Sequence, residues 1–134
     1  MKYSDLKFEE VTLQDIIDEL KKQKDLDKVC KIGFDSAHSW RGIYGELAFE
    51  PEESVTKRQM LIEAESAVNK IFTGYKGGNF KMKLTTSVHY DYYGNWSDGD
   101  QAKKDILKFL PDIDLEGRTE EWLDYKIFDL IINQ

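Results

Sequence analysis

Residues 73–80 constrain the fold most, because three glycines within eight residues interrupt any regular helix or strand that reaches them. The residues before this stretch have a helical apolar pattern, and those after it alternate as in a strand. Gly74 is therefore predicted to end the helix in the left-handed conformation common at helix C-termini. An anion there would meet the unfavourable end of the helix dipole, so an anion site must come from the turn and its side chains.

The same stretch has the residue types of a ligand-facing turn. Tyr75 and Phe80 can stack on a flat ring, Lys76 can meet a phosphate, and Gly77 and Gly78 let main-chain N–H groups approach a bound group. The spacing matches neither a dinucleotide fingerprint nor a P-loop. The alternative is a helix cap and a tight turn, with Phe80 in the core. Two consecutive glycines exceed what a cap needs, which favours a functional turn.

Residues 39–44, Ser-Trp-Arg-Gly-Ile-Tyr, offer similar chemistry. The planar guanidinium of Arg41 suits phosphate and stacks on bases, and Trp40 and Tyr44 flank it. The alternative is that Arg41 pairs with a carboxylate while Trp40 covers the sheet edge. The functional hypothesis requires that this run and the glycine stretch converge in space.

Residues 92–96 are the third candidate, because Asn95 can read donor and acceptor edges beside aromatic side chains. The alternative is a hairpin loop in which Trp96 covers the core. Clustered aromatic side chains also suit a homodimer interface.

Composition excludes several classes of function. A net charge of −7 repels long nucleic acids, whose binding depends on many neutralised phosphates, yet a small anionic ligand remains compatible with a few local cations. No apolar run approaches the roughly 20 residues that span a bilayer, and no signal peptide is indicated, so a cytoplasmic protein without a membrane partner is expected. The single cysteine, Cys30, is predicted to be a core residue, and no metal or cofactor is expected.

Two patterns predict amphipathic helices. Thr12 and Asp15 resemble a capping box that opens a helix over 12–24. Ser54 or Thr56, the latter with Gln59 three residues later, caps a second helix. Its predicted buried stripe is Leu61, Ala64, Val68, Ile71 and Phe72. A short third helix over 102–110 would end at Pro111.

Alternating apolar residues predict the strands. Residues 29–35 and 43–49, the second ending before Pro51, are expected to pair antiparallel, and 80–84 and 88–93 to form a hairpin. The apolar run 125–132 is predicted as a final strand. The expected fold is therefore α+β, a mainly antiparallel sheet of about five strands with two to three helices packed on it. At 134 residues the chain is expected to form a single domain.

Catalysis has little support in the sequence. Asp35, His38 and Ser39 lie within five residues, whereas a nucleophile and its base usually come from separate segments. His89 is predicted to lie mid-strand as a sheet-face residue. No catalytic residues are therefore assigned, and the protein is expected not to be an enzyme.

Residues 39–48 and 72–80, followed by Tyr93-Gly94, resemble a family of small phage proteins with the pattern Ser-aromatic-Arg-Gly-x-Tyr-x-x-Leu-Ala and then Phe-Thr-Gly-Tyr-Lys-Gly-Gly-x-Phe. This family is identified with the sponges that defeat the Thoeris defence system by sequestering its cyclic ADP-ribose signal. The resemblance covers about 12–95, and 96–121 looks like an insertion.

The resemblance implies a non-enzymatic binder of a cyclic nucleotide, a homodimer or higher homo-oligomer, acting in the host cytoplasm during infection. The expected ligand-binding residues are Trp40, Arg41, Tyr44, Tyr75, Lys76, Gly77, Gly78, Phe80 and Asn95. Two other hypotheses stay open: an acidic inhibitor that binds a host defence nuclease, and an enzyme acting on a nucleotide, which would need His38 or His89.

Overall fold

A computed structural model describes residues 11–91 and 120–134 of the chain. Its helices and strands are intermixed along the sequence, which confirms the α+β class. The elements in chain order are α2 (Leu13–Lys21), β1 (Val29–Ser39), the 3-10 turn η1 (Trp40–Gly42), β2 (Glu46–Thr56), α3 (Lys57–Ala67), β3 (Ile71–Thr73), β4 (Asn79–Lys81), β5 (Ser87–Tyr90) and α5 (Glu120–Ile132). The predicted helix over 102–110 lies outside the described residues.

The described strands form two sheets, not the single mainly antiparallel sheet that the sequence predicts. β1 and β2 pair antiparallel as expected, and β5 adds to β2 in parallel, giving the order β1-β2-β5. β3 and β4 form a separate antiparallel hairpin. The predicted hairpin of 80–84 with 88–93 is therefore wrong, because β4 finds its partner across the glycine stretch and β5 pairs with β2 instead.

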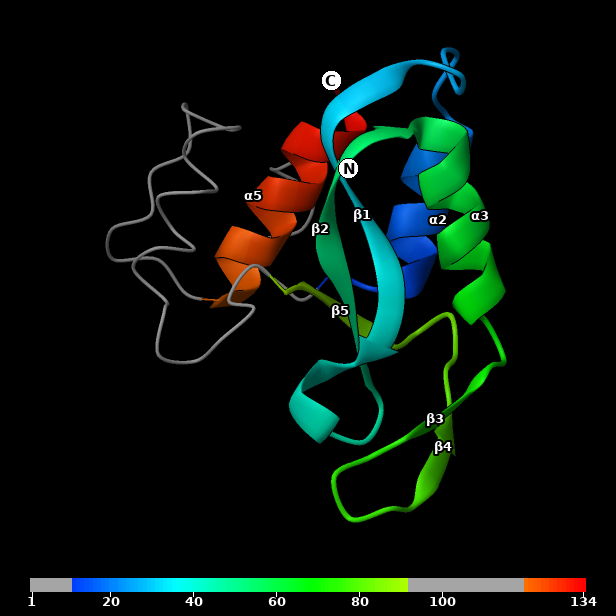
Figure 1. Cartoon of the computed structure of the whole chain (residues 1–134), viewed down its shortest axis with the longest axis vertical. Coiled ribbons are helices and arrows are strands. Elements are labelled where there is room, and N and C mark those ends of the chain that lie inside the picture. The colour runs from blue at the N-terminus through cyan, green and yellow to red at the C-terminus, as the bar shows by residue number, and fades with distance from the viewer. Residues whose placement is uncertain (1–10, 92–119) are drawn as a thin grey trace.

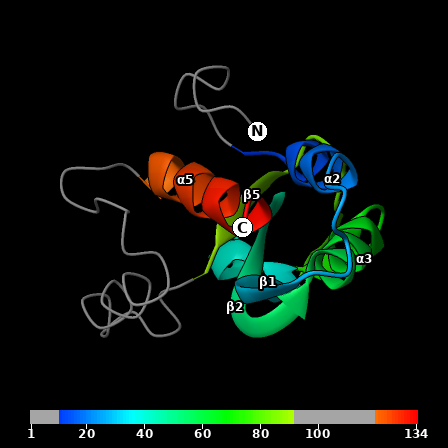
Figure 2. The same cartoon turned by 90° about the horizontal axis from the view of Figure 1, so that it is seen from above.

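The three helices cover the three-stranded sheet and enclose the core with it (Figures 1 and 2). Phe128 of α5 lies at the centre of this core, with its ring 5.7 Å from that of Phe34 and 5.6 Å from that of Tyr90, centroid to centroid. Leu13, Ile16 and Leu20 of α2 are also fully buried. Cys30 is buried, which confirms its predicted place in the core.

Residues 125–132 form a helix, which corrects the predicted strand. Asp124, Tyr125, Phe128, Ile131 and Ile132 are all buried, a repeat of three and four residues that matches a helix surface. A short, mainly apolar run, interrupted here only by Lys126 and Asp129, does not distinguish a helix from a buried strand, and packing against both sheet and helices selects the helix.

Two capping boxes set the starts of α2 and α3. Asp15 N–H donates to the Thr12 hydroxyl at 3.2 Å, and Thr12 N–H donates to the Asp15 carboxylate at 3.0 Å. Thr56 and Gln59 make the same reciprocal pair at α3. Both N-terminal predictions are confirmed, although α2 ends at Lys21 and not at 24.

The C-terminal end of α3 lies earlier than predicted. The helix ends at Ala67 because the next residue, Val68, is already extended, and Asn69 follows it in the left-handed conformation with a φ of +65°. Ile71 and Phe72, expected on the buried stripe of this helix, belong to β3 instead. The glycine stretch therefore connects two strands, and no helix dipole acts on it.

The central strands are longer than their predictions. β1 extends to Ser39, and β2 starts at Glu46 and runs through Pro51, which lies opposite Phe34 in the β1–β2 register. The β2–β5 register ends at Phe49. Pro51 is tolerated because, among the described residues, no strand pairs with β2 beyond Phe49 on the side that faces β5.

Lys57, the first residue of α3, is a buried cation that joins three parts of the chain. Its ammonium nitrogen donates to Gln23 Oε1 at 2.8 Å, Asp25 Oδ1 at 3.0 Å and the main-chain oxygen of Gln134 at 3.1 Å. The side-chain amide of Gln134 in turn bonds both the N–H and the C=O of Ile32.

Within residues 11–91 and 120–134, no helix has the length and apolar character required to cross a bilayer.

Lys57→Ala is expected to lower the free energy of unfolding by about 2–4 kcal/mol, because it leaves a cavity and removes the buried donor shared by Gln23, Asp25 and the main-chain oxygen of Gln134. Urea denaturation followed by circular dichroism measures the change. Lys28→Ala is the matched control, an exposed lysine in the adjoining loop. A Lys57→Ala protein as stable as the Lys28→Ala protein would contradict this role.

Candidate functional site

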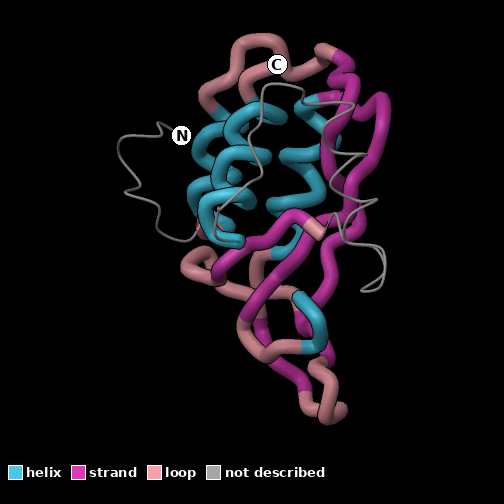
Figure 3. The backbone as a smooth tube through the Cα atoms, turned by 90° about the vertical axis from the view of Figure 1, so that its left-hand side faces the viewer, coloured by secondary structure: helices cyan, strands magenta, loops and turns pink. Residues whose placement is uncertain are grey.

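Loop 40–45 and the β3–β4 hairpin, hereafter the arm (residues 71–81), extend together from one end of the molecule (Figure 3). These are the two runs that the sequence singles out. The Tyr75 N–H donates to the Gly42 carbonyl at 2.9 Å, so the runs are in direct contact. Their convergence, on which the functional hypothesis depends, is present in the fold.

Tyr44 makes the main connection between the loop and the arm. Its hydroxyl oxygen accepts hydrogen bonds from the N–H groups of Lys76 and Gly78, each at 3.2 Å. Its ring lies edge-on to Phe80 with centroids 5.3 Å apart, and is tilted against Tyr75 at 5.9 Å. Tyr44 therefore inserts into the concave side of the hairpin turn.

The packing of Tyr44 explains why positions 74 and 78 are glycines. A Cβ atom at Gly74 would lie 2.4 Å from the Tyr44 ring, and one at Gly78 would lie 3.2 Å from the Tyr44 hydroxyl. Gly77 has a φ of +82°, the left-handed position of a three-residue hairpin loop, and a Cβ there would meet nothing within 4 Å. The prediction that Gly74 is a left-handed helix cap is wrong, because no helix precedes it and the left-handed residue is Gly77.

The main-chain donors of the turn are used within the protein. The N–H of Gly74 donates to the Gly78 carbonyl and that of Gly77 to the Gly74 carbonyl, both at 2.9 Å. Tyr75 bonds Gly42, and the remaining two N–H groups bond the Tyr44 hydroxyl. In this conformation the turn is not an open cradle of donors, so the exposed chemistry of the arm comes from its side chains.

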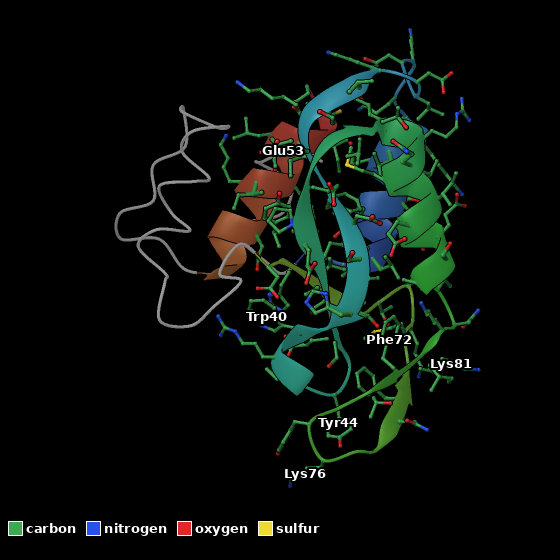
Figure 4. All side chains as sticks on the ribbon, viewed as in Figure 1. Trp40, Tyr44, Glu53, Phe72, Lys76 and Lys81 are labelled. Carbon is green, nitrogen blue, oxygen red and sulfur yellow. The ribbon has the colours of Figure 1, made fainter. Side chains whose placement is uncertain are left out.

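The exposed side chains of the arm are aromatic and basic. Tyr75 is 69% exposed, and Lys76 lies at the tip, farther from the sheet than Tyr44 (Figure 4). Phe80 is half-buried against Tyr44 and Phe72, so it supports the arm more than it offers a free ring.

Charge is separated along the molecule. Segments 37–45 and 68–90 contain no Asp or Glu, in a chain that carries 26 of them. Their cations are Arg41, Lys70, Lys76, Lys81 and Lys83. Exposed carboxylates Glu50, Glu52 and Glu53 lie on β2, and Glu53 lies toward the opposite end from Lys76 (Figure 4). The arm and loop 40–45 therefore contribute cations and no carboxylate of their own, in a protein whose net charge is −7.

Trp40 and Arg41 lie against the sheet at the base of the loop. Trp40 is 4% exposed and its ring stacks on His89, with centroids 4.6 Å apart and 16° between planes. The Arg41 guanidinium carbon lies 4.2 Å from the Trp40 ring centroid. Trp40 thus gives Arg41 a fixed position, and its own ring is covered.

His89 is held between two carboxylates, which sequence analysis missed. Its Nδ1 lies 2.8 Å from Asp124 Oδ2, and its Nε2 lies 2.8 Å from Glu46 Oε1. Burial lowers the pKa of His89, but the hydrogen bonds and charges of Asp124 and Glu46 outweigh it and raise the pKa overall. A raised pKa favours the imidazolium, in which both nitrogens donate to carboxylates and neither can accept a proton from a substrate. The partners lie 35 and 43 residues away, beyond any spacing motif.

His38 pairs with Asp91 and not with the neighbours that a Ser/His/Asp arrangement would require. Its Nε2 lies 2.9 Å from Asp91 Oδ2, and its Nδ1 donates to the Ser36 carbonyl at 2.8 Å. The Ser39 hydroxyl donates to the Ile43 carbonyl instead. The hydrogen bond with Asp91 raises the pKa of His38 above its ordinary value despite partial burial.

Asn95, the remaining expected ligand-binding residue, lies outside the described residues, as do Trp96 and nearly all of the possible insertion 96–121. Among residues 11–91 and 120–134, no cluster of His, Cys, Asp or Glu could hold a metal ion. Comparison with known proteins finds no matching family model, and neither a curated protein nor a solved structure that matches.

Raising the pH from about 6 to about 9 is expected to lower the free energy of unfolding. The folded pKa values of both histidines lie above the unfolded value of about 6.5. Their contribution is therefore complete below that value and is lost as the pH rises through the folded pKa values. Urea denaturation at several pH values measures the slope, and the sequence holds no other histidine.

The His38→Gln variant is the control for that measurement. It should reduce the slope of the free energy of unfolding against pH, while keeping the buried His89 cluster. NMR titration of the remaining imidazole, that of His89, should give a midpoint above that of free histidine. A stability profile that is flat or rises across this range would contradict the assignment of charged histidines.

Proposed function

We propose that the protein captures a small anionic nucleotide on the arm and loop 40–45 and holds it without transforming it. The observation that carries this proposal is the direct packing of the two runs, which presents aromatic rings and cations together in segments free of carboxylates. The resemblance of both runs to the sponge family makes a cyclic ADP-ribose isomer the ligand to test first. Sequestration of this messenger would make the protein a phage counter-defence factor.

Each exposed group has a defined role in this proposal. Tyr75 stacks on the adenine, since base stacking on an aromatic ring contributes about 1–3 kcal/mol. Lys76 and Arg41 meet the diphosphate through charge-assisted hydrogen bonds. Trp40 acts indirectly by positioning Arg41, and Phe80 supports Tyr44 and the arm.

Binding without turnover agrees with the state of the two histidines. His89 has both nitrogens bonded to carboxylates, and His38 has both nitrogens bonded to Asp91 and a carbonyl. For a sponge, affinity alone is the mechanism, because excess binder lowers the free messenger by mass action. A second copy of the chain is proposed to complete the ligand's enclosure, as the family resemblance implies.

The exposed carboxylates Glu50, Glu52 and Glu53 support a second candidate, an inhibitor that presents its acidic surface to a host defence nuclease. Of these carboxylates, Glu53 lies toward the end of the molecule opposite Lys76, and none belongs to the arm (Figure 4). Substitutions on the arm therefore discriminate between the two functions.

Tyr75→Ala and Lys76→Ala are each expected to weaken binding of the cyclic messenger by about tenfold, through lost stacking and a lost charge-assisted contact. Equilibrium dialysis of the messenger against purified protein measures this. Ile62→Ala and Lys24→Ala are matched controls, an exposed apolar residue on α3 and an exposed lysine in the α2–β1 connection.

Heat denaturation of the complex distinguishes the possible functions. Recovery of intact messenger supports sequestration, and recovery of an altered product supports an enzyme. No uptake of any nucleotide removes the sponge and leaves the acidic inhibitor. If both arm variants bind the messenger as tightly as the controls do, the assignment of the site to the arm is wrong.

A further inference from the structure

The turn of the arm contains a pair of donors aimed at a single point. The N–H groups of Lys76 and Gly78 stand two residues apart, with the left-handed Gly77 between them, and both point at the Tyr44 hydroxyl oxygen. Successive main-chain N–H groups in this arrangement form a nest, a concavity that binds anions. A neutral phenol oxygen therefore occupies a position suited to an anionic oxygen.

The hydrogen bonds from the nest to the Tyr44 hydroxyl are weak, as their lengths show. Both donor–acceptor distances are 3.2 Å, at the long end of the range for N–H···O bonds. Hydrogen bonds to an ionised acceptor are about twice as strong as those to a neutral one. A phosphate oxygen would thus bind these two donors better than the phenol does.

The surroundings permit the exchange. Tyr44 is 38% exposed, so its departure uncovers only part of a buried ring. The next residue, Gly45, has a φ of +78°, and no atom lies within 4 Å of where a Cβ would be, so nothing packs against Gly45 on that side. Lys76 supplies a cation beside the nest, and the adjoining segments 68–90 and 37–45 bring no carboxylate to oppose an anion.

We propose that the N–H groups of Lys76 and Gly78 are the phosphate subsite of the arm, and that the Tyr44 hydroxyl fills this subsite until a phosphate oxygen replaces it. This inference rests on the proposed function and specifies which part of the site takes the diphosphate. Tyr44 then acts as a built-in competitor that keeps the subsite closed in the free protein.

The test uses inorganic pyrophosphate as the probe on the full chain. Tyr44→Phe keeps the ring and its packing against Phe80 but removes the oxygen that competes for the nest. The dissociation constant for pyrophosphate is expected to fall by about fivefold, the effect of removing two weak neutral hydrogen bonds. In the 15N-labelled protein, the amide signals of Lys76 and Gly78 are expected to shift most during the titration.

Two further variants separate this effect from general changes in the arm. Thr73→Val removes a side-chain hydroxyl from the arm, one that bonds Asn79 and not a nest donor, and its pyrophosphate affinity should match that of the parent. Gly77→Val opposes the left-handed conformation on which the nest depends. In the double variant with Tyr44→Phe, it should abolish the gain in pyrophosphate affinity.

The outcomes also separate this inference from the proposed function. Unchanged or weaker pyrophosphate binding by Tyr44→Phe overturns the competitor role, and weaker binding would mean that the hydroxyl itself contacts the ligand. If the messenger binds while the amide signals of Lys76 and Gly78 stay still, the subsite fails and the proposed function stands. If neither the messenger nor pyrophosphate binds, both fail.

Discussion

The contact between His89 and two carboxylates joins three elements of the fold, the paired strands β2 and β5 and the helix α5. Glu46 comes from the start of β2, His89 from β5 and Asp124 from α5. Asp124 also accepts the N–H of Tyr90, so the same carboxylate bonds the main chain of β5. A buried ionic cluster is costly to desolvate and stabilises little in net terms, but it is strongly unfavourable with one member missing. It therefore favours one arrangement of β2, β5 and α5 over its alternatives.

The position of the arm depends on this cluster through Trp40. Trp40 stacks on the His89 imidazole, and loop 40–45 runs from that stack to the Tyr44 contact in the hairpin turn. The arm itself is a two-stranded hairpin of three-residue strands, which is marginal on its own. Its orientation thus depends on two anchors, an aromatic stack at the sheet and a phenol in the turn, and the ligand proposed for it would act on the second.

The sequence predicted correctly those features that depend on contacts between residues a few positions apart. The Thr12–Asp15 and Thr56–Gln59 pairs mark helix starts because each is satisfied within one turn of chain. The pairing of β5 with β2, and the helical state of α5, depend on partners far along the chain, so alternation and apolar runs did not reveal them. For the site, the meeting of the two runs was anticipated, yet the glycines proved to make room for Tyr44. The carboxylates around His89 had no sequence signal at all.

The contact between Gln134 and Ile32 has a consequence for the solution behaviour of the protein. One side-chain amide offers a donor and an acceptor to the main chain of β1, on the edge that does not face β2. Exposed strand edges recruit further strands from other molecules and so promote aggregation. By occupying the N–H and C=O of Ile32, Gln134 removes one donor and one acceptor from those that an incoming strand would need. The side-chain amide of Gln134 thus opposes the pairing of β1 with a strand of another molecule.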